Sequence, residues 1–485
     1  MYKKLAGQTI IYGIGAILPR IILFILNPIL IHEMKSGEFA VFTNLYALIS
    51  FVNILLSFGF ETSFFRFSAE KENEKKTFNT AFWFLFGTST IFLLLCMIFT
   101  QPIANFLHYE EHTEYIRWFA IIAFLDNLCV IPFAWLRFHN MPIKYSAVRV
   151  IQAIFQFTFT YLLFFYFSDK FIHFLGLKNK ESYPFYSNLA ASLLGVILLL
   201  PIILKVKIQF SFSLFKRMIK YSFPVMIAGL AFMVNENFDK SIQIRVISEE
   251  EAGSYGGAYK LAVLMTLFVT AYRLGIEPFF FKQMNNENAK NIYAQVTEFF
   301  TFFASTAALA LIANISWLKL ILIPDPSYWI AIDIIPIIVI ANLCFGVYYN
   351  FSTWYKVTDK TSIGTAISWL GAGINIIINF VALYYYKSMI GSAWATFFAY
   401  FAMMIISYLW GQKYYPIPYR IRKMMFFMGL LFVFSFLIVK VFNYNFWIGN
   451  LLFLIFVGTL FYSEKNQLKI ILEATPLKKL LKLKK

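Results

Sequence analysis

The sequence predicts an all-α protein that crosses a membrane many times. Of its 485 residues, 60% are hydrophobic and only 14% are charged, whereas a soluble globular protein is about half apolar and a quarter charged. Runs of about 20 apolar residues, long enough to cross the hydrocarbon core of a bilayer, recur along the whole chain. The hydrophilic stretches between them are short, so the chain has no room for a sizeable soluble domain.

Fourteen apolar runs are marked by their hydropathy and by the charged residues that separate them. The first six are Thr9 to Ile31, Ala40 to Phe60, Asn79 to Phe99, Tyr115 to Leu136, Ser146 to Phe167 and Pro184 to Leu204. The next six are Tyr221 to Ile244, Ala252 to Ile276, Ala294 to Trp317, Trp329 to Tyr355, Ser362 to Tyr386 and Met389 to Gly411. The last two are Ile421 to Phe442 and Phe446 to Ser463. We therefore expect about 14 transmembrane helices.

Lysine and arginine are distributed unevenly between the loops. With the N-terminus inside, the cytoplasmic segments hold 29 of the 42 lysines and arginines and the outer loops hold eight. Because positively charged loops stay in the cytoplasm, both termini are expected there. The tail from Lys465 to Lys485 carries seven lysines among leucines and isoleucines, which fits either an amphipathic segment on an anionic inner leaflet or a solvated tail. The net charge of +17 therefore indicates anionic lipids, and not nucleic acid, as a partner.

An internal repeat indicates two lobes. A shift of 216 positions lays Gly253 to Gln283 over Gly37 to Phe67 without a gap. A duplication whose copies cross the membrane in the same direction implies lobes related by an axis along the membrane normal, as in some transporters. Chance similarity between two apolar helices is the alternative. We place the lobe boundary in the polar linker Lys205 to Lys220, so that residues 1–208 hold spans 1–6 and residues 209–415 hold spans 7–12. Residues 416–485 hold spans 13 and 14 and the basic cytoplasmic tail.

Four cations inside predicted spans are candidates for binding an anionic substrate: Arg20, Lys240, Lys260 and Arg273. Ionisable groups in lipid are costly, so they usually face a cavity and have a function there. Arg20 follows a proline in the middle of the first span. Lys260 and Arg273 are 13 residues apart on the eighth span, roughly 20 Å along one helix face, and would line the same cavity.

Buried ion pairs are the alternative interpretation of these cations. Glu236 with Lys240, and Arg273 with Glu277, are both spaced i to i+4 on a helix. Asp126 and Asp239 are further carboxylates inside spans, so the sign of the charge in a central cavity stays open.

The sequence predicts no cofactor and no metal site beyond a possible monovalent cation. The three cysteines each fall inside an apolar run and are expected to be packing residues. His108 to His112 matches the pattern H-x-x-E-H of some zinc proteases, but it lies in a short outer loop with no fold around it to supply a third ligand. No phosphate-binding glycine loop is present, so an ATPase is not expected.

Several motifs resemble those of one transporter superfamily. The resembling stretches are Gly13-Ile14-Gly15-Ala16-Ile17-Leu18-Pro19-Arg20, Ser222-Phe223-Pro224, Asp239-Lys240, Gly253-Ser254-Tyr255, Glu277-Pro278-Phe279, Gly371 to Asn379 and Gly391 to Thr396. In order and spacing they resemble the first, seventh, eighth, eleventh and twelfth helices of the multidrug, oligosaccharidyl-lipid and polysaccharide exporter superfamily. Within it, they resemble the Wzx-like polysaccharide flippase branch.

This resemblance implies a fold and a function. The fold would be two six-helix lobes in a V around a central cavity, with two further C-terminal helices. The function would be to flip an undecaprenyl-diphosphate-linked oligosaccharide from the inner to the outer leaflet of the bacterial cytoplasmic membrane by alternating access, for cell-surface polysaccharide biosynthesis. A polysaccharide polymerase is the protein partner that such a role implies. A cavity with Arg20, Lys260 and Arg273 suits a diphosphate on physical grounds as well.

The resemblance also implies a site for a coupling cation. It places together Asp239, Asn375, Asn379 and Thr396, whose oxygens suit a hard monovalent cation such as Na⁺. Lipid II flippases resemble this arrangement with a second carboxylate where Asn379 stands here. The competing interpretation pairs Asp239 with Lys240 or Arg20, so that the carboxylate is structural or carries protons.

Three other functions stay open. A lipid II flippase for the peptidoglycan precursor and a cation-coupled drug exporter belong to the same superfamily. A membrane glycosyltransferase or polymerase is the alternative from another class, but it usually needs a sizeable outer loop, and the outer loops here are short. A transporter that is not an enzyme is therefore the preferred hypothesis.

The charge asymmetry of the loops generates a topology prediction. Reporters fused near Lys71, Lys216, Gln412 and Lys478 should report the cytoplasm, and those near Lys35, Lys180 and Lys387 the exterior, because basic loops are retained inside. Paired alkaline phosphatase and green fluorescent protein fusions measure this. An external signal at Lys216 would contradict the predicted orientation.

Overall fold

The computed structural model describes residues 2–69, 74–284, 286–358 and 360–474, and helices are the only regular secondary structure in these ranges. Thirteen helical segments among the described residues are long and apolar enough to cross a membrane. They correspond to the predicted spans 2 to 14, and helix α1 (Tyr2–Glu33) contains the predicted first span. The prediction of an all-α polytopic membrane protein is confirmed. Of the predicted basic tail Lys465 to Lys485, residues 465–474 continue helix α19 and residues 475–485 lie outside the described residues.

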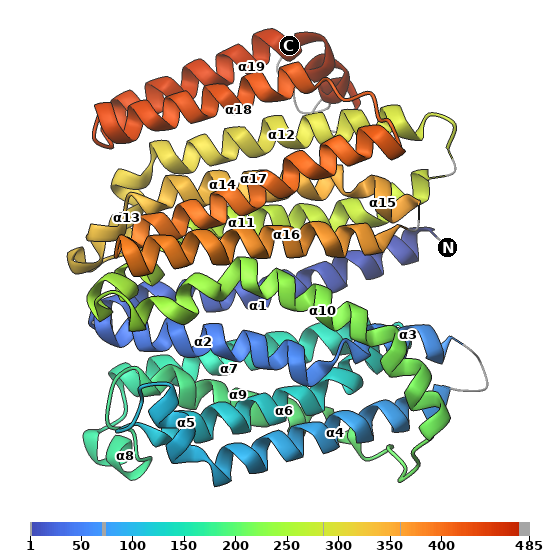
Figure 1. Ribbon diagram of the computed structural model, residues 1–485, viewed down its shortest axis with the longest axis vertical. Helices are drawn as coiled ribbons and strands as arrows, with labels where there is room; N and C mark the ends of the chain where they lie inside the picture. Colours follow the sequence, from blue (N-terminus) through green and yellow to red (C-terminus); the bar gives the residue numbers. More distant parts are fainter. Residues whose placement is uncertain (1, 70–73, 285, 359, 475–485) are drawn as a thin grey trace, which may run out of the picture. The chain divides into compact units, whose positions relative to one another are not determined.

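The helices follow one another with short connections, as Figure 1 shows. The first ten are α1, α2 (Ser36–Ser57), α3 (Phe60–Ser68), α4 (Glu74–Ile98), α5 (Thr100–Phe106), α6 (Thr113–Phe138), α7 (Pro142–Phe165), α8 (Asp169–Phe174), α9 (Ser182–Ile203) and α10 (Phe212–Ile242). The others are α11 (Glu249–Gln283), α12 (Ala289–Ala313), α13 (Ile315–Leu322), α14 (Ile334–Phe351), α15 (Thr353–Val357), α16 (Thr361–Phe380), α17 (Met389–Tyr414), α18 (Ile421–Phe436) and α19 (Phe446–Ala474). Short 3₁₀ turns cover Gln243–Arg245 and Pro326–Ala331, and π-helical turns extend α16 over Val381–Tyr385 and α18 over Leu437–Val441.

The chain forms two compact units that divide α11 and α17 between them. Unit 1 comprises Met1–Lys260, Leu322–Ile334 and Thr361–Ala399. Unit 2 comprises Leu261–Ile321, Ile335–Lys360 and Tyr400–Lys485. The predicted lobes, residues 1–208 and 209–415, and the C-terminal part, residues 416–485, rest on the internal repeat and the polar linker and stay a prediction.

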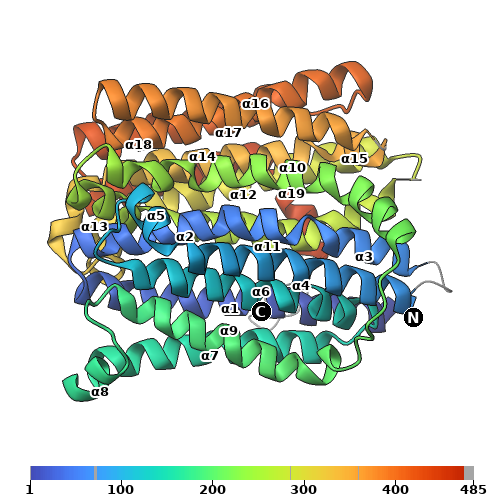
Figure 2. The same cartoon turned by 60° about the horizontal axis from the view of Figure 1, so that its bottom comes forward.

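Unit 1 is a bundle of long helices with an aromatic core. Helix α1 packs on α7, α7 on α9, α9 on α6 and α6 on α4, and these helices run side by side in Figures 1 and 2. Between α3, α4 and α6 lies a cluster that includes Phe60, Phe64, Phe78 and Phe82, all buried. Edge-to-face pairs, such as Phe64 on Phe78 at 6.2 Å between ring centroids, fill the space between helices.

Glycines in the first turns of α11 let its backbone approach neighbouring elements within unit 1. A Cβ atom on Gly253 would lie 1.6 Å from the carbonyl oxygen of Ser36 at the start of α2. A Cβ atom on Gly257 would lie 2.6 Å from the ring of Tyr328, whose hydroxyl donates a hydrogen bond to the carbonyl oxygen of Met34 at 2.8 Å. Small residues at such positions are typical of helix packing in membranes.

In unit 2 the two C-terminal helices pack on α12. Phe427 of α18 lies between Phe302 of α12 and Phe456 of α19, with centroid distances of 4.9 and 5.7 Å. Arg420, just before α18, donates a hydrogen bond of 2.8 Å from Nε to Glu298 of α12. Aromatic contacts and an ion pair therefore hold α18 and α19 to α12 (Figure 1).

The close approach at Gly253 generates a stability prediction. Gly253→Ala should strongly reduce the yield and the melting temperature of the folded protein, because backbone atoms of Ser36 occupy the space of the new methyl group. Gly275→Ala is the matched control on the same helix, since nothing lies within 4 Å of its Cβ position. It should be neutral or stabilising by up to about 1 kcal/mol from helix propensity. Thermal unfolding of detergent-purified variants measures both, and equal effects would contradict the prediction.

Candidate functional site

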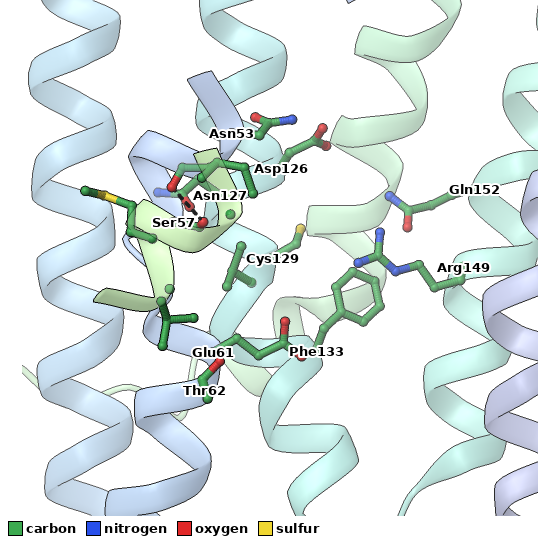
Figure 3. Close-up of a pocket in the computed structure, with 16 residues that line it drawn as sticks. Asn53, Ser57, Glu61, Thr62, Asp126, Asn127, Cys129, Phe133, Arg149 and Gln152 are labelled. Carbon is green, nitrogen blue, oxygen red and sulfur yellow. Dashed lines mark hydrogen bonds between the residues drawn. The ribbon is translucent and has the colours of Figure 1, made fainter. Parts of the chain in front are cut away.

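A polar pocket of about 430 Å³ lies within unit 1, lined by residues of α2, α3, α6, α7 and α10. We refer to it as the polar pocket, and Figure 3 shows its side chains. Its polar lining residues are Asn53, Ser57, Glu61, Thr62, Asp126, Asn127, Arg149 and Gln152. It therefore combines carboxylate, guanidinium, amide and hydroxyl groups in one membrane-spanning bundle.

A break between α2 and α3 shapes one wall of the polar pocket. Phe58 and Gly59 have φ angles of 48° and 66°, so the chain leaves the helical conformation there and begins a new helix at Phe60. The left-handed conformation costs least at glycine, and a Cβ on Gly59 would also lie 3.0 Å from the carbonyl oxygen of Ser222. The break turns the first residues of α3, including Glu61 and Thr62, into the pocket lining.

The polar pocket is lined by both acidic and basic side chains, and each of them contacts another side chain. Asp126 of α6 accepts a hydrogen bond of 2.7 Å from the hydroxyl of Ser192 on α9. The guanidinium of Arg149 on α7 lies 3.9 Å from the centroid of the Phe133 ring, a favourable cation–π contact. Glu61 forms an ion pair with Arg137. The pocket thus presents both hydrogen-bond donors and acceptors to a ligand.

Two amides complete the polar pocket. Asn127 donates to the carbonyl oxygen of Leu56 at 3.2 Å and to the hydroxyl of Ser89, which ties α6 to α2 and α4. Gln152 donates from Nε2 to the carbonyl oxygen of Ala191 at 3.2 Å. Its Oε1 atom is buried without a hydrogen-bond partner among the described residues. A buried acceptor without a partner is costly, and a ligand hydroxyl or a water molecule would satisfy it.

A second site lies where α10 ends and α11 begins, around the predicted cation ligand Asp239. Its carboxylate accepts hydrogen bonds from the Tyr255 hydroxyl at 2.5 Å, from the Lys240 backbone N–H at 2.8 Å and from Lys240 Nζ at 3.2 Å. The side chains of Asp239 and Lys240 are only 3% and 9% exposed. Lys240 Nζ also donates to the carbonyl oxygen of Glu236 at 2.6 Å and lies 3.6 Å from the Tyr259 ring centroid. The N–H donors and the charge of Lys240 are therefore largely engaged by neighbours within unit 1.

Lys260 lies in an aromatic setting beside this ion pair. Its Nζ atom is 6.0 and 5.7 Å from the ring centroids of Phe39 and Phe42 on α2, and Lys240 acts on it electrostatically. No residue in the part of unit 1 that the structure describes accepts a hydrogen bond from Lys260 Nζ.

Asn44 of α2 fixes the end of α10, because its amide donates to the carbonyl oxygens of Lys240 and Ser241 at 3.0 and 2.8 Å.

The structure brings the predicted ligands Asn375 and Asn379 of α16 together. Asn379 Nδ2 donates to Asn375 Oδ1 at 2.8 Å and to its carbonyl oxygen at 3.1 Å. Both side chains are buried, and Asn375 Nδ2 and Asn379 Oδ1 have no partner among the described residues. Thr396 of α17 is also buried and donates to the Ser392 carbonyl oxygen at 3.5 Å. Within the described ranges no hydrogen bond joins these three residues to Asp239.

The two remaining predicted cations lie in different units. Arg20 is an exposed residue of α1 in unit 1. Arg273 belongs to unit 2, where its guanidinium lies 4.3 Å from the Tyr349 ring centroid and 5.4 Å from that of Phe345. Glu277, which the i to i+4 spacing pairs with Arg273, lies 3.5 Å from Lys356 Nζ in the structure.

The polar pocket contains residues that the sequence pattern does not single out. Arg149 falls near the start of the predicted span Ser146 to Phe167 and is not among the candidate cations; in the structure it lies in the third turn of α7. Arg149 and Gln152 are spaced i to i+3, which places a cation and an amide on one helix face. This spacing is the sequence feature that could have identified Arg149 as a pocket residue. Glu61 gives no such signal, because its position depends on the break at Gly59.

Comparisons with known proteins agree with this architecture. The sequence profile of the family described as "Polysaccharide biosynthesis protein" matches residues 5–275. No curated protein sequence gives a significant match.

Solved structures with similar folds were also found. The structure of the lipid II flippase MurJ in an inward closed conformation has a TM-score of 0.73 at 17% identity, and the match covers 94% of this chain and 99% of that one. An inward-facing multidrug resistance MATE family transporter of the MOP superfamily has a TM-score of 0.65 at 13% identity, covering 84% and 97%. The Vibrio cholerae MATE transporter VcmN has a TM-score of 0.60 at 13% identity, covering 85% and 97%.

Proposed function

The chain belongs to the polysaccharide biosynthesis protein family within the MOP exporter superfamily, and we propose that it flips an undecaprenyl-diphosphate-linked oligosaccharide from the inner to the outer leaflet. The membrane is the bacterial cytoplasmic membrane, with both termini in the cytoplasm. The glycan is a building block of a cell-surface polysaccharide, and a polysaccharide polymerase takes it over outside. The transporter works by alternating access of two lobes.

The family match over residues 5–275 is the observation that carries this proposal, and the described side chains support it chemically. A diphosphate carries several negative charges and needs charge-assisted hydrogen bonds when it leaves water. Lys260 offers an ammonium group that no acceptor of the described residues occupies. The carboxylates, amides and hydroxyls of the polar pocket are the groups that hydrogen-bond sugar hydroxyls. Arg20, Lys240, Lys260 and Arg273 are the proposed cations for the substrate.

A second candidate is a lipid II flippase, favoured by the fold similarity to MurJ. Both candidates move a diphosphate-linked lipid, so the cations serve either one. The two differ in the sugar, and a transport assay with each lipid separates them.

Removal of the proposed diphosphate cations tests the function. Arg20→Ala and Lys260→Ala should each abolish export of the lipid-linked glycan while the protein level and membrane insertion stay normal, because each removes a charge-assisted hydrogen bond in a low-dielectric environment. Complementation of a flippase-deficient strain and a vesicle assay with the purified glycolipid measure this. Lys144→Ala, an exposed lysine outside both sites, is the matched control.

Two outcomes would contradict this proposal. Full activity of both variants would make Arg20 and Lys260 structural cations. Transport of lipid II, but not of undecaprenyl-diphosphate oligosaccharides, would establish the second candidate instead.

We further propose that transport is coupled to a monovalent cation, Na⁺ in the first instance, held by Asp239, Asn375, Asn379 and Thr396. Asn379 Oδ1 is a buried carbonyl oxygen without a partner among the described residues, and hard cations prefer oxygen ligands. When the ion binds, the Asp239 carboxylate would give up its bond to Lys240 Nζ and coordinate the ion instead. The site would hold one formal negative charge, which suits weak monovalent binding.

Ion gradients test the coupling. Uptake of the glycolipid into vesicles should increase with an imposed Na⁺ gradient, and Asp239→Asn and Asn379→Leu should each remove that increase. If transport ignores Na⁺, follows a proton gradient and is lost in Asp239→Asn, the carboxylate is a proton carrier and the cation site is wrong.

A further inference from the structure

A second pocket of unit 1 lies at the end of the bundle where α4 begins and α6 and α9 end, and we call it the basic pocket. Its volume is about 540 Å³, and its lining includes three lysines, Lys75, Lys205 and Lys207. Trp135 and His139, at the end of α6, form its wall. The charge distribution of the loops predicts that this end faces the cytoplasm. It shares no lining residue with the polar pocket.

Polar groups on side chains of α4 hold the backbone that displays two of these lysines. The segment after α9 is pinned to α4, because the Lys207 N–H donates to Asn79 Oδ1 at 3.1 Å and Trp83 Nε1 donates to the Lys207 carbonyl oxygen at 2.8 Å. Four residues further, the Ser211 N–H donates to Thr80 Oγ1 at 3.2 Å. The backbone is therefore anchored, while the side chains of Lys205 and Lys207 stay exposed.

Among the described residues that line the basic pocket, Glu74 is the one carboxylate, and it pairs with a histidine and not with a lysine. Glu74 lies 3.1 Å from Nε2 of His139, and Nδ1 of the same ring lies 3.1 Å from the carbonyl oxygen of Trp135. Lys205 Nζ lies 5.2 Å from the ring centroid of Trp135. None of the three lysines forms an ion pair within the part of the chain that the structure describes. A concave surface whose three ammonium groups have no ion-pair partner among the described residues is suited to a multiply hydrogen-bonding anion such as a phosphate.

Apolar groups also line the basic pocket, and they favour a phospholipid over a free phosphate ion as its ligand. Phe78 and Ile202 contribute to the lining, and Leu204 is 75% exposed beside Lys205. Trp135 provides an aromatic face, as tryptophan does at membrane interfaces. Basic pockets between transmembrane helices on the cytoplasmic side are suited to anionic lipid head groups. A free phosphate ion would use the lysines alone, whereas a phospholipid would use both the lysines and the apolar rim.

We propose that the basic pocket binds the phosphate head group of an anionic phospholipid, with the glycerol and the first acyl carbons against Ile202 and Leu204. This lipid is not the transported substrate. It would join the segment after α9 to the start of α4 and the end of α6, in addition to the hydrogen bonds at Asn79 and Thr80.

Binding of phosphatidylglycerol to the full-length protein tests the proposal. Native mass spectrometry of detergent-purified protein titrated with phosphatidylglycerol gives the apparent Kd. The triple variant Lys75→Gln, Lys205→Gln and Lys207→Gln should bind on the order of 100-fold more weakly, since each lysine at an anionic lipid surface contributes about fivefold. The triple Lys→Arg variant at the same positions should bind within about threefold of the parent, because it keeps the charge that the head group requires.

A matched control and two competitors decide the outcome. The triple variant Lys144→Gln, Lys216→Gln and Lys220→Gln removes the same charge from exposed lysines outside the basic pocket, and it should bind like the parent. Phosphatidylcholine should bind weakly to all variants, and inorganic phosphate at millimolar concentration should not displace the lipid. Equal loss in both triple variants would show unspecific surface attraction and overturn the site. Displacement by inorganic phosphate would identify a phosphate-ion site and overturn the lipid assignment.

Discussion

The cost of a buried charge is the constraint on which the junction between α10 and α11 depends. Asp239 has a side chain that is only 3% exposed, and an ionised carboxylate at such a position costs several kcal/mol unless it is paired and hydrogen-bonded. Three donors meet it: the Tyr255 hydroxyl, the Lys240 backbone N–H and Lys240 Nζ. These contacts tie the last turn of α10 to the first turns of α11. Removal of one donor would leave part of this buried charge without compensation.

The close packing of α11 against α2 places Tyr255 within hydrogen-bonding distance of Asp239. Gly256 and Gly257 follow Tyr255 directly, and side chains at these positions would collide with Thr43 of α2 and with Tyr328. The small residues thus set how near α11 lies, and the neighbouring tyrosine reaches Asp239 as a consequence. Asn44, the neighbour of Thr43 on α2, donates hydrogen bonds to the final carbonyl groups of α10. Packing and charge pairing depend on each other in this region.

The sequence was sufficient for the spans but not for the partners of the charged groups. Hydropathy located the helices, because about 20 apolar residues are needed to cross a bilayer, and thirteen of the fourteen runs fall on described helices that are long and apolar enough to do so. The spacing of Arg273 and Glu277 suggested an ion pair, yet Glu277 lies beside Lys356, a residue 79 positions away in the chain. Arg149 and Glu61 enter the polar pocket through the packing of α7 and the break at Gly59. Such tertiary contacts are invisible to periodicity, which describes only one helix at a time.

The candidate cations differ in how many of their N–H donors remain for a substrate. Lys240 donates to Asp239 and to the Glu236 carbonyl oxygen and lies over the Tyr259 ring, so its hydrogen-bonding capacity is largely used within the protein. Lys260 lies beside Phe39 and Phe42, and ring faces stabilise an ammonium group without consuming its N–H donors. A phosphate oxygen arriving at Lys260 would therefore gain a charged donor without breaking an existing ion pair. Lys240 and Asp239 form an ion pair whose charges largely cancel for an arriving anion, so among the described residues of this site the positive charge for the substrate comes from Lys260.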